Sequence, residues 1–552
     1  MESSTQSSPL SSWSECFVLK RIRMLVPVGF QTETKKLSQL AGPVIIAQLM
    51  VFAVSFVSTV FCGHLGRTEL AGVTLAISVI NVTGISIGSG LAAACDTLIS
   101  QTFGSCNLLR VGVILQRAIL ILMLACFPCW AILINTESIL LAVRQDPEVA
   151  RLSQLYVKIF MPALPAAFMY SLETRYLQNQ GIIWPQVITG FVVNLLNALI
   201  NYIFLYVLNL GVPGSAVANT ISQFSMAGIL YAYIIWRGLH KATWGGWSKE
   251  CLQDWGSYIH LAIPSMVMMC VEWWTYEIGS FLAGLINEVE LGAQSVVYEL
   301  ANVAYMFPLG FSMAGNVRVG NALGAGDTEQ AKLSAKLAMV CAGSVSICLA
   351  VFIGGLKDHI SYVFTYDEQI RERVADVIAF YAPFTLLDAI SAASGGIIRG
   401  AGKQKIGAIC NILGYYGVGF PIGVPLMFAA KLGIKGLWTG LFTCVSLQSS
   451  FLIFYLVRMN WKKAMIEAQI RAGVCGSSTD TSPQPDGPEN SQGQTDTLDL
   501  VGTELGPAVK TEEEEELSHR TLVLRRGLAL AVMLFILAAG IIMNLLLTNL
   551  VT

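Results

Sequence analysis

Long apolar segments recur along the whole chain, and they constrain its fold more than any other feature. Thirteen such stretches can be distinguished. Each is long enough to cross the hydrocarbon core of a bilayer as a helix of about 20 residues. They begin near Leu40, Ala71, Val111, Leu155, Trp184, Gly211, Tyr258, Gly292, Lys332, Val374, Ile406 and Gly433, and the last runs from Gly527 to Leu547. The sequence therefore predicts an all-α polytopic membrane protein.

The composition agrees with lipid as the surrounding solvent. Of the 552 residues, 54% are hydrophobic and 13% are charged, whereas about a quarter of the residues in a soluble domain are charged. A net charge of −2 and five histidines without metal-ligand spacing give no reason to expect a nucleic-acid partner, a metal site or a cofactor. The chain lacks the G-x-x-x-x-G-K-[ST] motif of P-loop ATPases, so we expect no enzyme and only secondary transport.

Six regions follow from the distribution of these segments. We predict a cytosolic N-terminal segment (1–37), a first lobe of six spans (38–236), an inter-lobe cytosolic loop (237–257), a second lobe of six spans (258–457), a disordered cytosolic linker (458–526) and a thirteenth helix with an extracellular C-terminus (527–552). The linker is rich in Ser, Thr, Pro, Gly and acids, including the run 512–516, and buries too little apolar surface to fold.

Basic residues predict the orientation in the membrane. The loops on the side of the N-terminus carry 25 of the 34 Lys and Arg, and the loops on the other side carry 9. Because basic loops stay on the cytosolic side, we expect a cytosolic N-terminus.

Internal similarity indicates a duplication. Residues 40–43, Leu-Ala-Gly-Pro, return as Leu-Ala-Ile-Pro at 261–264, an offset of 221 residues, and 210–212 resemble 432–434 at an offset of 222. Six spans per repeat give both lobes the same orientation, as in transporters built from parallel repeats. We therefore predict two parallel six-helix lobes with a cleft that opens alternately to either side.

Acidic residues within the spans gather in the second lobe. Glu272, Glu277, Glu299 and Asp388 fall at mid-depth or in the outer half of their spans, with no intramembrane Lys or Arg expected to neutralise them. Carboxyl groups at this depth are costly unless they are protonated or line a wet cavity. Such a cluster can hold either protons or a cation, which predicts the competition that an antiporter needs.

Aromatic residues accompany these acids. They include Trp273, Trp274, Tyr276, Tyr298 and Tyr305, and a spacing of seven places Tyr298 and Tyr305 on one helix face with Asn302 between them. Aromatic faces beside carboxylates suit an organic cation. Each aromatic alone could instead belong to an interfacial belt.

Several motifs together resemble the animal members of the multidrug and toxic compound extrusion (MATE) family. They are Cys62-Gly-His-Leu-Gly66, Glu272-Trp-Trp-Thr-Tyr-Glu277, Gly292-Ala-Gln-Ser-Val-Val-Tyr-Glu-Leu300, Val317-Arg-Val-Gly-Asn-Ala-Leu-Gly-Ala-Gly326 and Ser394-Gly-Gly-Ile-Ile-Arg-Gly400. The resemblance extends from about Gly42 to Lys463. It implies a V-shaped twelve-helix core that exports organic cations such as tetraethylammonium and metformin in exchange for protons, typically at the apical plasma membrane of epithelial cells.

The resemblance also implies roles for individual residues. Glu272, Glu277 and Glu299 resemble glutamates required for transport, and Asp388 stands where animal members commonly have Glu. Residues that resemble positions near the substrate cavity are Gln48, Asn81, Trp273, Tyr276, Tyr298 and Tyr305, and those that resemble thiol-sensitive positions are Cys62 and Cys126. A sodium-coupled exporter and a lipid flippase on a related two-lobe frame remain the alternatives.

Overall fold

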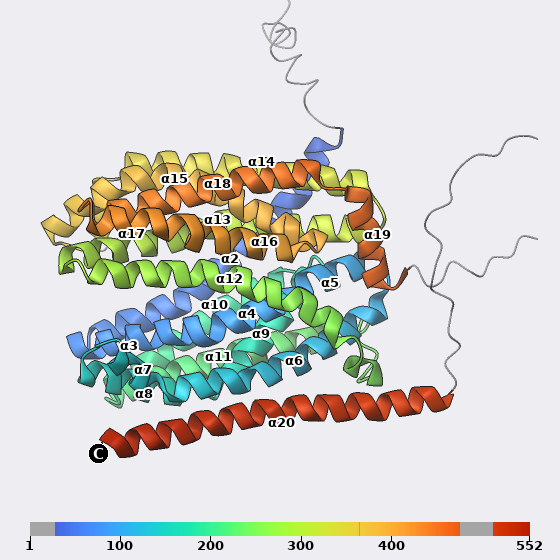
Figure 1. Ribbon diagram of the computed structural model, residues 1–552, viewed down its shortest axis with the longest axis horizontal. Helices are drawn as coiled ribbons and strands as arrows, with labels where there is room; N and C mark the ends of the chain where they lie inside the picture. Colours follow the sequence, from blue (N-terminus) through green and yellow to red (C-terminus); the bar gives the residue numbers. More distant parts are fainter. Residues whose placement is uncertain (1–27, 364, 475–511, 552) are drawn as a thin grey trace, which may run out of the picture.

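The protein is a bundle of long, roughly antiparallel helices. The computed structural model describes residues 28–363, 365–474 and 512–551. Figure 1 shows two layers of helices, with α20 lying along the outside of the first layer. In the described residues nine helices are long and apolar enough to span a membrane, and a bent pair gives a tenth. The helices α11, α12 and α13, of 26, 30 and 37 residues, are long enough to supply the other three of the thirteen predicted spans. The all-helical, two-lobe membrane fold predicted from the sequence is therefore confirmed.

The N-lobe comprises the first six passes. Its elements are α2 (Phe30–Gly63), α3 (Arg67–Ile80), η3 (Asn81–Ile85), α4 (Ser86–Ala92), α5 (Ala94–Gly104), α6 (Leu108–Ile134), α7 (Thr136–Ala142), α8 (Pro147–Phe160), α9 (Ala163–Gln178), α10 (Trp184–Tyr202), η4 (Ile203–Val207) and α11 (Val212–Arg237). The segments α3 to α5 form one interrupted pass, and α8 and α9 form another that bends by 59°. Pro162 at this bend cannot continue the hydrogen-bond ladder of α8.

The C-lobe repeats this plan. Its elements are η5 (Lys249–Leu252), α12 (Trp255–Gly284), α13 (Glu288–Gly324), α14 (Thr328–Gly355), η6 (Ile360–Val363), α15 (Glu368–Ala401), α16 (Gln404–Asn411), η7 (Ile412–Gly419), α17 (Phe420–Phe428), α18 (Ile434–Arg458) and α19 (Trp461–Ala472), followed by α20 (Glu512–Val551). Side chains cap the starts of three long helices, since Asn287, Asp327 and Asp367 each accept a hydrogen bond from a backbone N–H of the first turn.

Backbone geometry carries a trace of the duplication. Gly211 precedes α11 with φ 68° and ψ −139°, and Gly433 precedes α18 with φ 64° and ψ −139°. A positive φ of this kind strains any residue with a Cβ atom. Two residues earlier, Asn209 and Lys431 are also left-handed, with φ 50° and 57°. The two lobes therefore share an unusual turn at equivalent places.

One helix belongs to both lobes. The first half of α12, with Trp255, Tyr258 and Leu261, packs into the core of the N-lobe, whereas its second half, with Val271 and Ala283, packs into the core of the C-lobe. The sequence placed all of residues 258–457 in the second lobe. The structure differs because a long helix can bury its two halves against different neighbours.

The lobes are joined tightly at the end of the bundle that carries α19, here called the α19 end. A Cβ atom on Gly324 would overlap the backbone carbonyl of Gln101, and one on Gly104 would overlap that of Asn321, so α5 and α13 cross backbone against backbone. Gln101 also donates through Nε2 to the carbonyl oxygen of Gly400 at 2.9 Å. Small residues at such crossings allow close approach within a membrane.

A buried ion pair reinforces this junction. Glu33 of α2 is 2% exposed and accepts two hydrogen bonds from Arg318 of α13, at 2.9 and 2.8 Å. Ser334 of α14 donates to the same carboxylate at 2.7 Å. Paired and fully hydrogen-bonded charges can be buried at tolerable cost. The α19 end is therefore closed by contacts of α2, α5 and α13.

Toward the far end, opposite α19, the lobes separate. On α12, Met266 abuts Gly90 of α4, but Ile278, Phe281 and Leu285 further along the helix are 39%, 45% and 60% exposed. On α2, Ile45 abuts Gly310 of α13, whereas Phe56, eleven residues later on the same face, is 54% exposed. Side chains of both lobes are thus exposed toward the far end.

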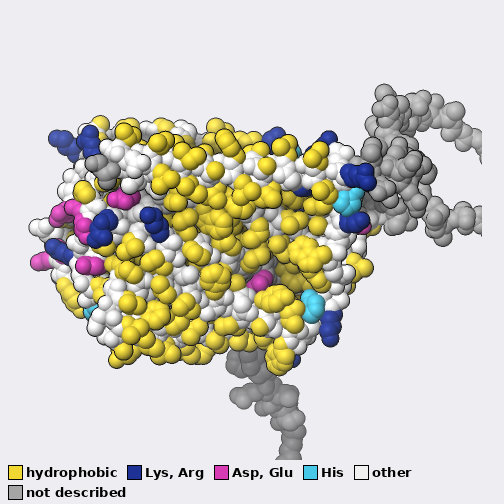
Figure 2. All heavy atoms as spheres, turned by 90° about the horizontal axis from the view of Figure 1, so that it is seen from below, with side chains coloured by type: hydrophobic (Ala, Val, Ile, Leu, Met, Phe, Trp, Pro, Cys, Tyr) yellow, Lys and Arg dark blue, Asp and Glu magenta, His cyan; other side chains and the backbone are white. Residues whose placement is uncertain are grey.

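The surface has the pattern of a membrane protein. Figure 2 shows a broad hydrophobic face between two ends where the charged side chains gather. None of the residues in the most apolar 18-residue segment of α20 is buried inside the protein. Such a surface is stable only against lipid, so the protein is a multi-pass membrane protein.

The structure differs from the predicted linker (458–526) at both ends of that segment. Residues Trp461–Ala472 form α19, which begins at the side-chain cap Asn460 and buries Ala464, Ala468 and Ala472. The reason is a helical period of small residues that fits against α5 and α13. At the other end α20 begins at Glu512, earlier than the expected start at Gly527. The predicted linker residues 475–511 and N-terminal residues 1–27 lie outside the described part.

The last helix packs on the N-lobe. Gly540 of α20 lies against Ala131 of α6, and Asn135 donates through Nδ2 to the carbonyl oxygen of Gly540 at 3.1 Å. Near the α19 end, Arg526 lies over the ring of Trp255 at 4.4 Å and donates to the carbonyl oxygen of Leu252 at 3.1 Å. Contacts at these two places fix both halves of α20 to the bundle.

Candidate functional site

The four acids of the C-lobe form two pairs. Glu272 lies near the middle of α12, and Asp388 lies on α15, where the two carboxyl groups interact electrostatically. Both charges also act on the hydroxyl groups of Tyr276, Tyr305 and Tyr415. Glu272 and Asp388 therefore share one tyrosine-lined site, here called the inner pair.

A second pair lies closer to the far end. The charges of Glu277 on α12 and Glu299 on α13 act on one another. The hydroxyl group of Tyr298 donates to Oε1 of Glu277 at 3.4 Å, and the charge of Glu299 also acts on this hydroxyl group. Asn302 interacts with the same hydroxyl group. Glu277 and Glu299 are here called the outer pair.

Tyr276 connects the two pairs. Its ring centroid lies 5.9 Å from that of Tyr298, beside the outer pair, and 6.3 Å from that of Trp438. Its hydroxyl group interacts electrostatically with the inner pair. Trp438 is held in place by a hydrogen bond from Nε1 to Oε1 of Gln294 at 2.9 Å. Buried Trp side chains usually find such a partner, and here it fixes an aromatic wall behind both pairs.

One cation reaches the inner pair, contrary to expectation. We expected no intramembrane Lys or Arg to neutralise these acids, but the charge of Arg399 acts on Glu272. Arg399 stands near the end of α15, and its Nη2 donates to Oγ of Ser312 at 3.2 Å. The expectation was wrong because a long guanidinium side chain extends well beyond the depth of its own Cα atom.

The cleft face of the N-lobe holds the other polar candidates. Gln48 lies three residues after Ile45 on α2, so it continues the face that meets α13, and it is half-buried. Glu299 lies eleven residues before Gly310 on the face of α13 that meets α2. Both side chains therefore stand along the cleft, beyond the point where the two helices touch.

Trp274 bridges the lobes at the bottom of this cleft. Its Nε1 donates to the carbonyl oxygen of Val82 at 3.0 Å, next to the candidate Asn81 in the π-helical segment η3. A π-helical turn displaces carbonyl groups from the regular ladder and is frequent at functional sites. Trp273 is 37% exposed. The sequence named both tryptophans, but only the structure distinguishes Trp274 as the inter-lobe contact.

The N-lobe contains two further intramembrane acids with different surroundings. Asp96 is fully buried, forms an ion pair with Arg175 and accepts a hydrogen bond from Asn179 at 3.3 Å. This network gives Asp96 a structural role in the core of the N-lobe. Glu173 is half-buried, and its Oε2 atom is enclosed without a hydrogen-bond partner.

The two candidate thiols lie inside the N-lobe core. Cys62 and Cys126 are 0% and 1% exposed. The thiol of Cys62 donates to Oγ of Ser215 at 2.9 Å. A reagent would reach either thiol only when the helices around it move, so their reactivity would report on conformational change.

The contacts that close the α19 end were not predicted from the sequence. Arg318, Gly320, Asn321 and Gly324 were noted only as part of a motif, yet they make the contacts that close the α19 end. The spacing of four between Gly320 and Gly324 was the available signal, because such pairs mark close helix crossings in membranes.

The arrangement can bind a cation and exchange it for protons. Two carboxyl pairs and the tyrosines around them lie in the C-lobe, and the two lobes are joined tightly at the α19 end. Carboxylates attract positive charge, aromatic faces add cation–π attraction, and the same oxygens bind protons. Occupancy by one ligand then disfavours the other.

Known proteins resemble this chain along almost its whole length. The MatE family matches twice, over residues 43–203 and 264–424, which are separated by the same 221 residues as the sequence repeats. Multidrug and toxin extrusion protein 1 of Danio rerio is 64% identical over 546 residues, covering 95% of this chain and 92% of that protein. The protein of the same name from Homo sapiens is 51% identical over 564 residues, covering 99% of each. The crystal structure of the eukaryotic MATE transporter AtDTX14 matches 80% of this chain and 100% of its own with a TM-score of 0.78 at 29% identity.

Proposed function

The chain belongs to the MATE family, and from this premise we propose that it exports organic cations across the plasma membrane in exchange for protons. The proposal rests mainly on the inner and outer pairs of carboxyl groups in the C-lobe, which Tyr276 connects. Relatives named multidrug and toxin extrusion proteins support the export of drug-like substrates. Tetraethylammonium and metformin represent the expected class.

Exchange follows from competition at the carboxyl pairs. In the form that is open at the far end, protons enter the cleft and bind the carboxylates, and the loss of negative charge releases the organic cation. Closure of the far end and opening of the α19 end then expose the protonated pairs to the other side. There the protons leave, and the restored carboxylates bind the next cation.

Residues on the cleft surface position the cation in this scheme. Tyr276, Tyr298 and Tyr305 offer ring faces beside the acids, and Gln48, Asn81 and Asn302 offer neutral polar groups that do not compete with the cation for charge. Trp273 stands on the neighbouring surface of α12. Tetraalkylammonium groups have no hydrogen to donate, so ring faces and diffuse negative charge suit them better than directed hydrogen bonds.

The orientation is proposed from the distribution of charge. The α19 end carries the larger share of Lys and Arg, which places it in the cytosol by the positive-inside rule. The N-terminus is then cytosolic, the C-terminus is extracellular, and the cleft described above is open to the outside. An apical location in epithelial cells is the expected setting.

Transport in proteoliposomes tests the proposal. Uptake of labelled tetraethylammonium into vesicles with an imposed pH gradient should exceed uptake without one. We expect Glu272→Gln and Asp388→Asn each to lower the rate by about tenfold or more, since removing an intramembrane charge changes the binding of a cation by several kcal/mol. Asp388→Glu keeps the charge and should retain gradient-driven uptake. Glu329→Gln, at an exposed helix start, is the matched control.

The same vesicles distinguish the alternatives. Equal uptake with and without the pH gradient would rule out proton exchange. Uptake that follows a sodium gradient at constant pH would assign the chain to sodium-coupled exporters instead. Movement of a labelled phospholipid between leaflets, without uptake of tetraethylammonium, would indicate a flippase.

A further inference from the structure

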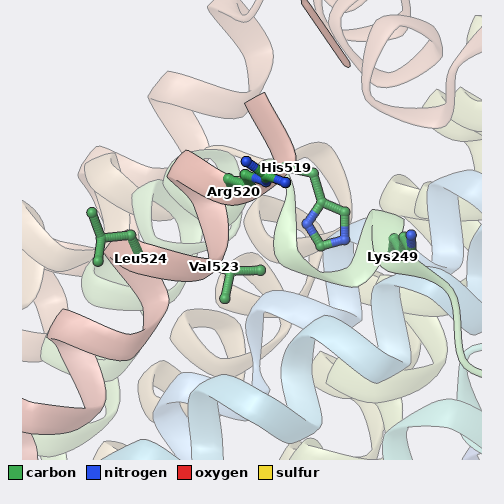
Figure 3. Close-up of a pocket in the computed structure, with 5 residues that line it drawn as sticks. All are labelled: Lys249, His519, Arg520, Val523 and Leu524. Carbon is green, nitrogen blue, oxygen red and sulfur yellow. The ribbon is translucent and has the colours of Figure 1, made fainter. Parts of the chain in front are cut away.

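A second cavity lies far from the cleft, where α20 meets the loop between the lobes. It is an open concavity of about 410 Å³ lined by Lys249, His519, Arg520, Val523 and Leu524. Figure 3 shows Lys249 on the loop facing His519 and Arg520 on α20, with Val523 and Leu524 further along the helix. Two sequence regions that are far apart therefore build one concave site.

The chemistry of the lining is amphiphilic. Two cationic side chains and an imidazole stand at one part of the cavity, and two aliphatic side chains stand at the other. A ligand that fits this lining carries negative charge on one portion and an apolar portion beside it.

The depth of the cavity matches the headgroup layer of a bilayer. The apolar run of α20 begins at Gly527, and the lining residues 519–524 precede it by three to eight residues. At 1.5 Å per helical residue this is about 4–12 Å beyond the hydrocarbon core, which is where phosphate groups lie, given total and hydrocarbon thicknesses of about 40–45 Å and 30 Å. The aliphatic side chains lie on the side of the core.

The contacts of α20 keep the cavity in place. Arg526, one turn below the lining, lies 4.4 Å from the ring centroid of Trp255 and donates to the carbonyl oxygen of Leu252. Leu252 ends η5, the same short helix that begins with Lys249. The two walls of the cavity are thus tied together directly beneath the cationic groups.

We propose that this cavity binds the phosphate headgroup of an anionic phospholipid from the adjacent leaflet. The phosphate pairs with Lys249 and Arg520, and the start of the acyl region lies against Val523 and Leu524. Basic pockets beside transmembrane helices on the basic side of a membrane protein are suited to such headgroups. The lipid would then join α20 to the inter-lobe loop. Its position is separate from the cleft and from the residues proposed for exchange.

Lipid titration of the full-length protein in detergent tests this assignment. Native mass spectrometry would compare the binding of phosphatidylserine with that of phosphatidylcholine. We expect preferential binding of phosphatidylserine, and a loss of about fivefold in that binding for each of Lys249→Ala and Arg520→Ala, as each basic group near a membrane surface contributes about that factor. Lys249→Arg should keep the binding, and Lys405→Ala, an exposed lysine on α16, should not change it.

Three results would overturn the proposal. An unchanged phosphatidylserine affinity in the double variant Lys249→Ala/Arg520→Ala would show that these charges do not hold the headgroup. An equal loss for phosphatidylcholine would indicate an apolar groove without charge recognition. Displacement of phosphatidylserine by inorganic phosphate at similar concentration would assign the site to a soluble anion. Uptake of tetraethylammonium into vesicles by Lys249→Ala is measured alongside. Uptake equal to that of the parent would show that this site is separate from the proposed transport function.

Discussion

Gly324→Ala should shift the conformational balance of the protein, because Gly324 stands where two backbones meet. A Cβ atom there would overlap the backbone carbonyl of Gln101 on α5, and neither α5 nor α13 can relieve the overlap by turning a side chain. Introducing one methyl group into a packed interface typically costs about 1–3 kcal/mol. The cost falls only on the form that is closed at the α19 end, since the lobes part here in the opposite form.

The expected shift follows from this difference in free energy. A bias of about 1–3 kcal/mol changes the ratio of two states by about 5- to 150-fold. The α19 end of Gly324→Ala should therefore open far more often than that of the parent. The buried Glu33–Arg318 ion pair is present in both proteins, so it affects the population of the open form in each but not the ratio between them.

Spin-label distances measure the shift directly. One label replaces Leu109, which is 63% exposed at the start of α6, and the other replaces the exposed Lys405 on α16, with the exposed native thiols changed to serine. The distance distribution in reconstituted protein should gain a longer component in Gly324→Ala. Gly63→Ala is the matched control, because Gly63 also ends a long helix and its new Cβ would meet nothing within 4 Å. An unchanged distribution in Gly324→Ala, or an equal change in Gly63→Ala, would refute the reasoning.

Two further predictions concern α19 and α20. Glu467 accepts a hydrogen bond from Lys403 at 2.9 Å, which holds the pKa of this carboxyl group below its usual value. The contact therefore stabilises the packing of α19 at neutral pH and is lost as the pH falls through the lowered pKa. Hydrogen exchange of α19, corrected for its intrinsic pH dependence, should accelerate below about pH 4 in the parent and not in Glu467→Gln. Arg526→Ala removes a cation–π contact with Trp255 of about 0.5–2 kcal/mol, so exchange at the start of α20 should accelerate, whereas Arg525→Ala, at an exposed neighbour, should match the parent; equal rates in both variants would contradict this role.

The transmembrane passes and the duplication were predictable because their signals are local. Each pass needs about 20 consecutive apolar residues, and each repeat leaves similar residues at a constant offset. The left-handed turns at Gly211 and Gly433 show that equivalent sequence positions adopt equivalent backbones. The start of α20 was missed because the acidic run 512–516 resembles a linker in composition, and α19 was missed because its 12 residues are too few for a span.

The candidate site was predictable only in part. Hydropathy identified Glu272, Glu277, Glu299 and Asp388 as costly residues within apolar segments, since each must be compensated by its surroundings. Which carboxyl group approaches which depends on the rotation and crossing of α12, α13 and α15, and these are set by packing between distant segments. The spacing of residues along the chain predicts neither the approach of Glu272 to Asp388 nor the reach of Arg399 toward Glu272.

By itself, the sequence determined that the chain is a duplicated, membrane-embedded helical protein with acids concentrated in one lobe. Length, polarity and repetition are properties of consecutive residues, and the bilayer selects on them directly. The tertiary structure alone decided that α12 is shared between the lobes, that Gly104 and Gly324 close one end of the cleft, and that Lys249 meets Arg520 beside α20. These features join residues more than 150 positions apart, and only the packing of whole helices brings such residues into contact.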